Sequence, residues 1–315
     1  MKKALFTLIL GLAATLTSKA QEAATYSQYQ LFPVLYNPGV TGFSGNHEFI
    51  LNARKSQTGF SGTPVSYTAM YHGSIGDKLG LGGAIFSEKI GDMTSTKVQG
   101  NYAFRFRLQK AQVGIGLTTE FINKRVNSEL LSDPLVQAGD QSLEDQVGGQ
   151  QIFDATAGIH VLYDERLFVA LALPNTVRTR LDQGVIDGPQ VTAPNDRSNY
   201  FFHFGYIVNR PAQGFSVIPS LALRNYRDVP FQVDLNVQGR FLEDKLVAAV
   251  TMRPGTSGLA GLMIGTMLKG AQIVYSYDIA FGPFQQYHTG SHELTLSYVI
   301  KPKAKRAVTA PGDYQ

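Results

Sequence analysis

The ionisable residues of this 315-residue chain do not form any of the spacings that enzymes use. The six histidines are scattered, with no HExxH-type arrangement, so a zinc site is not expected. There is no GxSxG nucleophile motif, and the absence of cysteine excludes thiol nucleophiles, thiolate metal ligands and disulfides. The pairs Gly80/Gly82 and Gly114/Gly116 lack the third glycine and the following helix of a dinucleotide-binding loop. We therefore predict no enzymatic activity, no cofactor and no metal.

Ionisable side chains instead occupy alternate positions of apolar segments. Between Lys97 and Leu108, aromatic and aliphatic residues alternate with Lys, Gln, Asn and Arg, and segments 199–209, 231–241 and 271–280 alternate similarly. This period places one strand face on an apolar environment and the other on a polar one. The expected polar faces carry Lys97, Arg105, Arg107, Glu120, Asp154, His160, His203, Asp234, Arg240, Asp278 and Glu293. These residues either line a binding channel or pair with one another and fill the interior, because buried charges need partners.

Strands are the elements that must position these residues, since no segment after the N-terminus shows a helical period. Each expected strand is near the ~10 residues with which a tilted strand crosses a bilayer. Fourteen are expected, at 48–55, 65–73, 79–87, 95–107, 111–121, 151–163, 166–173, 198–209, 214–223, 231–241, 245–253, 257–268, 271–280 and 290–300.

The connections alternate between short charged turns and longer loops. The turns are 76–78, 109–110, 164–166, 243–245 and 269–270, and the loops are 56–64, 88–94, 122–150, 174–197, 224–230 and 281–289. This pattern predicts an all-β, antiparallel transmembrane barrel in the outer membrane, with both termini on the periplasmic, short-turn side. A soluble two-sheet sandwich would also alternate. Aromatic residues at strand ends, and polar faces without a lysine-rich solvent pattern, favour the barrel.

The two ends of the chain explain its net charge of +4, which therefore does not indicate nucleic-acid binding. Residues 1–20 have the basic start, short apolar run and small-residue cleavage site of a signal peptide. The run is too short for the alternative, a membrane anchor of ~20 residues. Residues 21–47 are rich in Tyr, Gln, Asn and Pro and are expected to pack inside or under the barrel, which spans 48–300. Residues 301–315 read as a flexible, basic periplasmic tail.

The size of the barrel leaves its interior undecided. Fourteen strands enclose more space than an eight-stranded barrel and less than a sixteen-stranded porin. A plug, a bound guest, a passive channel and a small-solute transporter all remain possible interpretations, although the polar interior does not suit hydrophobic solutes.

Two motifs resemble the PorP/SprF family. Residues 26–42, YSQYQLFPVLYNPGVTG, are similar to the family's opening, which typically reads FSQYMFNPLYYNPAYAG. Residues 54–64, RKSQTGFSGTP, are similar to its YRxQWxGFxGAP element, with Thr58 in place of the family's Trp and Ala53 in place of its Tyr.

This resemblance implies an outer-membrane barrel of the type IX secretion system of Bacteroidota. It implies three kinds of protein partner: other secretion components, a large secreted adhesin held through its C-terminal domain and often serving gliding motility, and a peptidoglycan-associated periplasmic protein. The lipid bilayer is the remaining partner, and no nucleic acid is expected. We hypothesise that Arg54, Gln57, Gly62 and Pro64 order the loop 56–64 and contact the secreted partner; bracing of the barrel rim is an equally good interpretation.

Overall fold

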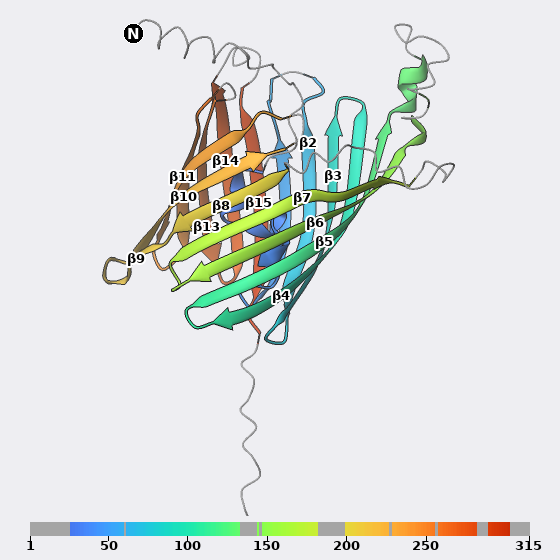
Figure 1. Cartoon of the computed structure of the whole chain (residues 1–315). Coiled ribbons are helices and arrows are strands. Elements are labelled where there is room, and N and C mark those ends of the chain that lie inside the picture. The colour runs from blue at the N-terminus through green and yellow to red at the C-terminus, as the bar shows by residue number, and fades with distance from the viewer. Residues whose placement is uncertain are drawn as a thin grey trace, which may run out of the picture.

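The computed structural model describes residues 26–59, 61–132, 144, 147–181, 199–226, 229–255, 258–281 and 289–302. The expected signal peptide and most of the expected tail lie outside these residues. Sequential antiparallel strands form one sheet, and β11 pairs with both β12 and β10, which closes it into a barrel (Figure 1). The elements β8 and β9 both pair with β10 and form one interrupted strand, so the predicted fourteen-stranded barrel is confirmed.

The strand bounds are β1 His47–Lys55, β2 Val65–Ile75, β3 Leu79–Ile90, β4 Met93–Leu108, β5 Ala111–Val126, β6 Gln150–Tyr163, β7 Leu167–Arg180, β8 Tyr200–Tyr206, β9 Val208–Arg210, β10 Phe215–Asn225, β11 Gln232–Phe241, β12 Leu246–Arg253, β13 Gly258–Leu268, β14 Ala271–Phe281 and β15 Ser291–Ile300. We call the end of the barrel with the short connections the turn end and the opposite end the loop end. The start of β1 pairs with the end of β15, at the turn end.

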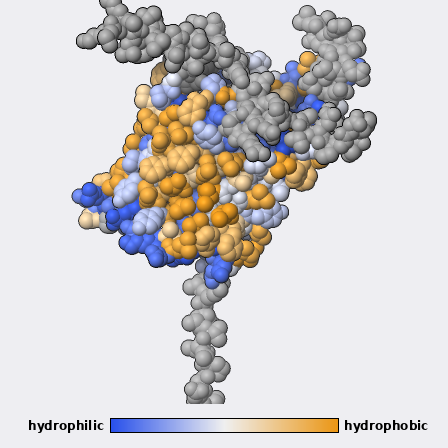
Figure 2. Space-filling view, viewed as in Figure 1, coloured by the Kyte–Doolittle hydropathy of each residue, from blue (hydrophilic) through white to orange (hydrophobic). Residues whose placement is uncertain are grey.

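Side-chain exposure alternates along the strands as the sequence pattern predicts. In β4, Tyr102 and Phe104 are half exposed on the outer wall, whereas Asn101 and Arg105, on either side of this pair, are buried inside. Apolar residues therefore cover much of the outer wall in Figure 2. An apolar exterior around a polar interior is the arrangement that a bilayer requires of a barrel. Among the described residues, no helix is long and apolar enough to cross a membrane.

Several strands extend beyond their predicted ends. Strand β5 continues to Val126 and β7 to Arg180, where the sequence predicted loops starting at residues 122 and 174. Proline cannot donate to a sheet ladder, which is why Pro174 suggested the end of a strand. The structure accommodates it in a bulge, where Asn175 has φ +55° and the register with β6 shifts. The pairing of β7 with β8 stops at Ala172. The part of β7 beyond the bulge, up to Arg180, therefore pairs only with β6 among the described strands.

Residues 26–46, here called the lumen segment, lie inside the barrel (Figure 1). They form three short 3-10 helices, η1 Ser27–Gln30, η2 Pro33–Leu35 and η3 Pro38–Val40. Proline begins η2 and η3, where its missing N–H costs no hydrogen bond. The sequence predicts that residues 21–47 pack inside or under the barrel; of these, residues 21–25 lie outside the described ranges.

Candidate functional site

The wall glycines explain how the lumen segment fits so closely. A Cβ on Gly116 would overlap the backbone of Pro38, and one on Gly80 would overlap the carbonyl of Thr41. A Cβ on Gly114 would likewise meet the carbonyl of Gly39. These strand glycines, which do not complete a dinucleotide-binding loop, permit backbone-to-backbone contact between the wall and the lumen segment.

An ion cluster at the loop end of β1 holds the start of the lumen segment. Arg54 forms ion pairs of 2.9 Å with Glu293 and 3.0 Å with Asp278, and all three side chains are at most 5% exposed. The backbone N–H of Ser27 donates to Glu293 at 2.7 Å, and the Ser27 hydroxyl donates to Asp278. The amide of Asn52 donates to the other oxygen of Glu293 at 2.8 Å. Charges buried in this way require mutual neutralisation, so the cluster and the lumen segment stabilise each other.

A second buried cluster holds the lumen segment from the other side of the barrel. Asp234 is paired with Arg253 at 2.6 Å and with Arg224 at 3.1 Å, and it accepts a hydrogen bond from the Tyr29 hydroxyl at 3.2 Å. The Arg224 guanidinium lies 4.4 Å from the centroid of the Tyr29 ring and also faces the Tyr36 ring. Burial raises the pKa of both tyrosine hydroxyls, which keeps them neutral.

The end of the lumen segment is fixed at the turn end. Arg105 donates to the carbonyls of Gly42 at 2.5 Å and of Phe43 at 3.1 Å. Near the middle, the Asn37 amide donates to the wall carbonyl of Ile159 at 2.9 Å. Because strands all around the barrel contribute such contacts, the lumen segment occupies the interior at this level as a fixed part of the fold.

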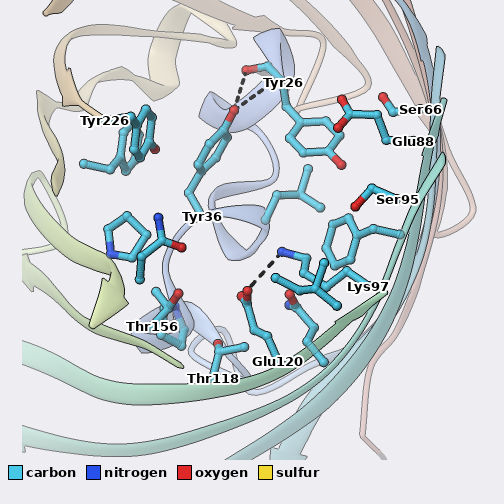
Figure 3. Close-up of a pocket in the computed structure, with 18 of the residues that line it drawn as sticks. Tyr26, Tyr36, Ser66, Glu88, Ser95, Lys97, Thr118, Glu120, Thr156 and Tyr226 are labelled. Atoms are coloured by element: carbon cyan, nitrogen blue, oxygen red, sulfur yellow. Dashed lines mark hydrogen bonds and ion pairs between the residues drawn. The ribbon is translucent and has the colours of Figure 1, made fainter. Parts of the chain in front are cut away.

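A chamber of about 280 Å³ remains on the loop-end side of the lumen segment (Figure 3). Its floor includes Tyr26 and Tyr36 of the lumen segment, and Tyr226 faces Tyr36 from the opposite side to Lys97. Its charged residues come from strands in the region β3 to β7, with Glu88 on β3, Lys97 on β4, Glu120 and Lys124 on β5, and Arg178 on β7. Lys97 pairs with Glu120 at 3.4 Å. A blind chamber with one aromatic and one charged face can hold the end of a peptide or another small polar group.

The four predicted partner-binding residues lie at the rim or below it. The Arg54 guanidinium points into the interior, and only its Nε reaches the loop, by donating to the Ser56 hydroxyl at 3.2 Å. The backbone N–H of Ser56 donates to the Pro64 carbonyl at 2.9 Å, which closes the loop. The Gly62 carbonyl accepts a hydrogen bond from the β3–β4 turn, and the backbone N–H of Gln57 donates to a β15 side chain. These contacts brace the rim, and partner binding by the four residues stays a prediction.

The remaining predicted lumen residues are spread over the barrel. Asp154 is fully buried and accepts a hydrogen bond from its neighbour's N–H, while His203 is buried with its ring 5.2 Å from that of Tyr29. Arg240 is partly exposed, and Arg107 is exposed near the turn end of β4. No group of three or more His, Asp or Glu side chains in the described ranges could hold a metal ion.

Sequence reasoning missed Glu88, Lys124, Arg178 and Tyr226 as chamber residues. All four fall in segments that were assigned to loops. A usable signal exists in residues 120–124, where apolar and polar residues continue to alternate past the predicted end of the strand.

Comparisons with known proteins agree with this architecture. The sequence profile of the family described as type IX secretion system membrane protein PorP/SprF matches residues 18–298. A search of curated proteins found no similar sequence. Among solved structures, the CymD monoaromatic hydrocarbon channel is 11% identical with a TM-score of 0.51, over 87% of this chain and 92% of that one. The Ralstonia pickettii toluene transporter TbuX is 11% identical with a TM-score of 0.49, over 84% and 92%.

The likeness to CymD supports the barrel fold alone. The match of the family profile extends over the lumen segment and nearly all of the barrel, and it confirms the resemblance seen in the two motifs. The chain therefore belongs to the PorP/SprF family of type IX secretion system membrane proteins.

Proposed function

We propose that this barrel assists the secretion of a large partner protein and holds that partner at the cell surface. The observation that carries the proposal is the closed lumen: the lumen segment is fastened by two buried ion clusters and leaves a chamber at the loop end. A barrel that is closed at one end is suited to receive part of a guest and to hold it. The membership in a secretion family supplies the class of guest, a secreted protein.

The orientation that suits this role places the loop end outside the cell and both termini in the periplasm. Short turns face the periplasm in outer-membrane barrels, and the start of β1 and the end of β15 lie at the turn end. The guest that fits best is a large adhesin, held through its C-terminal domain and serving gliding motility. In this orientation the basic tail would meet a peptidoglycan-associated protein.

A passive channel or small-solute transporter is the alternative, and the structure gives reasons to rank it second. A channel needs a continuous path, whereas Tyr29 and Phe32 of the lumen segment are 1% exposed within the barrel. A hydrophobic solute needs an apolar pocket, whereas the chamber contains Lys97, Glu120 and Arg178.

The test is affinity purification of the mature barrel in mild detergent, followed by mass spectrometry. A large secreted protein with a type IX C-terminal signal should co-purify with it. Gln57→Ala should lower surface display of that protein, with normal insertion of the barrel, while Lys55→Gln, a change at the exposed neighbouring end of β1, should not. Recovery of the barrel alone from a secreting strain would contradict the proposed function, and unchanged display in Gln57→Ala would remove Gln57 from the binding surface.

A further inference from the structure

The charged wall of the chamber carries two cations that form no ion pair with any residue that the structure describes. Lys124 of β5 and Arg178 of β7 both line the chamber, and neither lies within 4.0 Å of an acidic oxygen in the described ranges. Because both groups line one cavity, they repel each other. Glu88 lies near Lys124, and Asp154 of β6 is the cross-strand neighbour of Arg178, but neither carboxylate forms an ion pair with these two cations in the described ranges. Two neighbouring cations in a partly enclosed space favour the binding of an anion between them.

The chamber also restricts how a chain can enter it. Its floor is the lumen segment, so an extended guest cannot pass through and only a chain end or the tip of a loop can reach Lys124 and Arg178. The volume of about 280 Å³ is at the low end for ligand sites, which suits a few residues rather than a folded domain. An N-terminal ammonium would add a further positive charge beside Lys124 and Arg178, whereas a C-terminal carboxylate brings a negative one.

The opposite face of the chamber suits the residues that precede such a carboxylate. Tyr36, Phe201 and Tyr226 form an aromatic surface, and Arg224 is stacked under the first two, at 5.4 and 5.5 Å from their ring centroids. Aromatic side chains bury apolar groups of a guest and their hydroxyls can hydrogen-bond its backbone.

We propose that the chamber binds the extreme C-terminal residues of a polypeptide, with the terminal carboxylate held between Lys124 and Arg178. This inference rests on the proposed function and deepens it, because it assigns the part of the guest that enters the barrel. The carboxylate accepts charge-assisted hydrogen bonds from both cations, and the aromatic surface receives the preceding side chains.

The test uses the full mature barrel in detergent and two pools of random decapeptides that differ only in a free or an amidated C-terminus. The free-acid pool should be retained about tenfold or more above the amidated pool, and Lys124→Gln and Arg178→Gln should each remove about tenfold of retention. Arg125→Gln is the matched control, because Arg125 adjoins Lys124 on the opposite, exposed face of β5. Lys124→Arg should keep the preference, which separates loss of charge from loss of fold.

Equal retention of the two pools would overturn the proposal. So would enrichment of Asp or Glu in both pools regardless of the terminus, because the site would then recognise side-chain carboxylates. Retention that is unchanged in Lys124→Gln and Arg178→Gln would also overturn it. Co-purification of a secreted protein with a barrel that shows no preference for free acids would leave the proposed function standing and reject only the terminal-carboxylate site.

Discussion

Replacement of Arg54 by Gln should loosen the lumen segment without unfolding the barrel. The guanidinium of Arg54 is 5% exposed and holds Asp278 at 3.0 Å and Glu293 at 2.9 Å. Its loss leaves two carboxylates buried without a cation, and breaking a buried ion pair in this way costs about 3–5 kcal/mol. Because Ser27 and Asn52 still donate to Glu293, we use the lower end of this range, about 3 kcal/mol. This free energy corresponds to a roughly hundredfold larger population of molecules in which the lumen segment is released.

Hydrogen–deuterium exchange of the mature protein in lipid nanodiscs measures this population directly. Amides of residues 26–46 should exchange about a hundredfold faster in Arg54→Gln, with the strand amides unchanged. Lys55→Gln, which changes an exposed charge next to Arg54, should leave them protected. The triple change Arg54→Met, Asp278→Asn and Glu293→Gln should restore protection, because it removes the unpaired charges. Unchanged exchange of the lumen segment in an inserted Arg54→Gln barrel would refute the reasoning.

Three further changes test the packing, the bilayer and the second ion cluster. The side chain of Gly116→Val would overlap the backbone of the lumen segment and should destabilise its packing by about 1–3 kcal/mol. This loosening should appear as ion conductance across planar bilayers. The control is Gly148→Ala, whose added methyl group has no described atom within 4 Å, and this variant should not conduct. Leu262→Arg on the outer wall of β13 should destabilise the folded barrel in the bilayer by about 2–4 kcal/mol and lower its heat-modifiable fraction on gels. Leu242→Arg in a turn should destabilise it by only about 0–1 kcal/mol. Equal effects of the two changes would contradict burial of β13 in lipid. Asp234→Asn leaves two buried arginines unneutralised and should lower the midpoint of thermal unfolding; an unchanged midpoint would show that the cluster does not stabilise the fold.

The barrel could be predicted from the sequence because its physical cause is local. Apolar and polar residues alternate within any short stretch of a strand, as Asn101, Tyr102, Phe104 and Arg105 do in β4. This alternation follows from a strand that has lipid on one face. The strand ends were less predictable. Pro174 breaks a regular ladder, but the structure absorbs it in a bulge, and no local rule distinguishes the two outcomes.

The contacts that hold the lumen segment could not be predicted, because they join segments that are distant in the chain. Arg54 looked like a rim residue from its position at the end of a strand, yet its guanidinium reaches Asp278 and Glu293, more than two hundred residues away in the chain. The sequence around Gly116 served only to exclude a dinucleotide-binding loop, and the structure shows that this residue contacts the backbone of Pro38. Only the closure of the barrel brings these groups together around the lumen segment.

In our interpretation, the fixed lumen segment closes this barrel. Conductance of the intact mature protein in planar bilayers measures this closure. We expect the intact protein to insert without steady ion current, and we expect a current after deletion of residues 21–46. A steady, ohmic current through the intact protein would show that the lumen is open and would contradict the account.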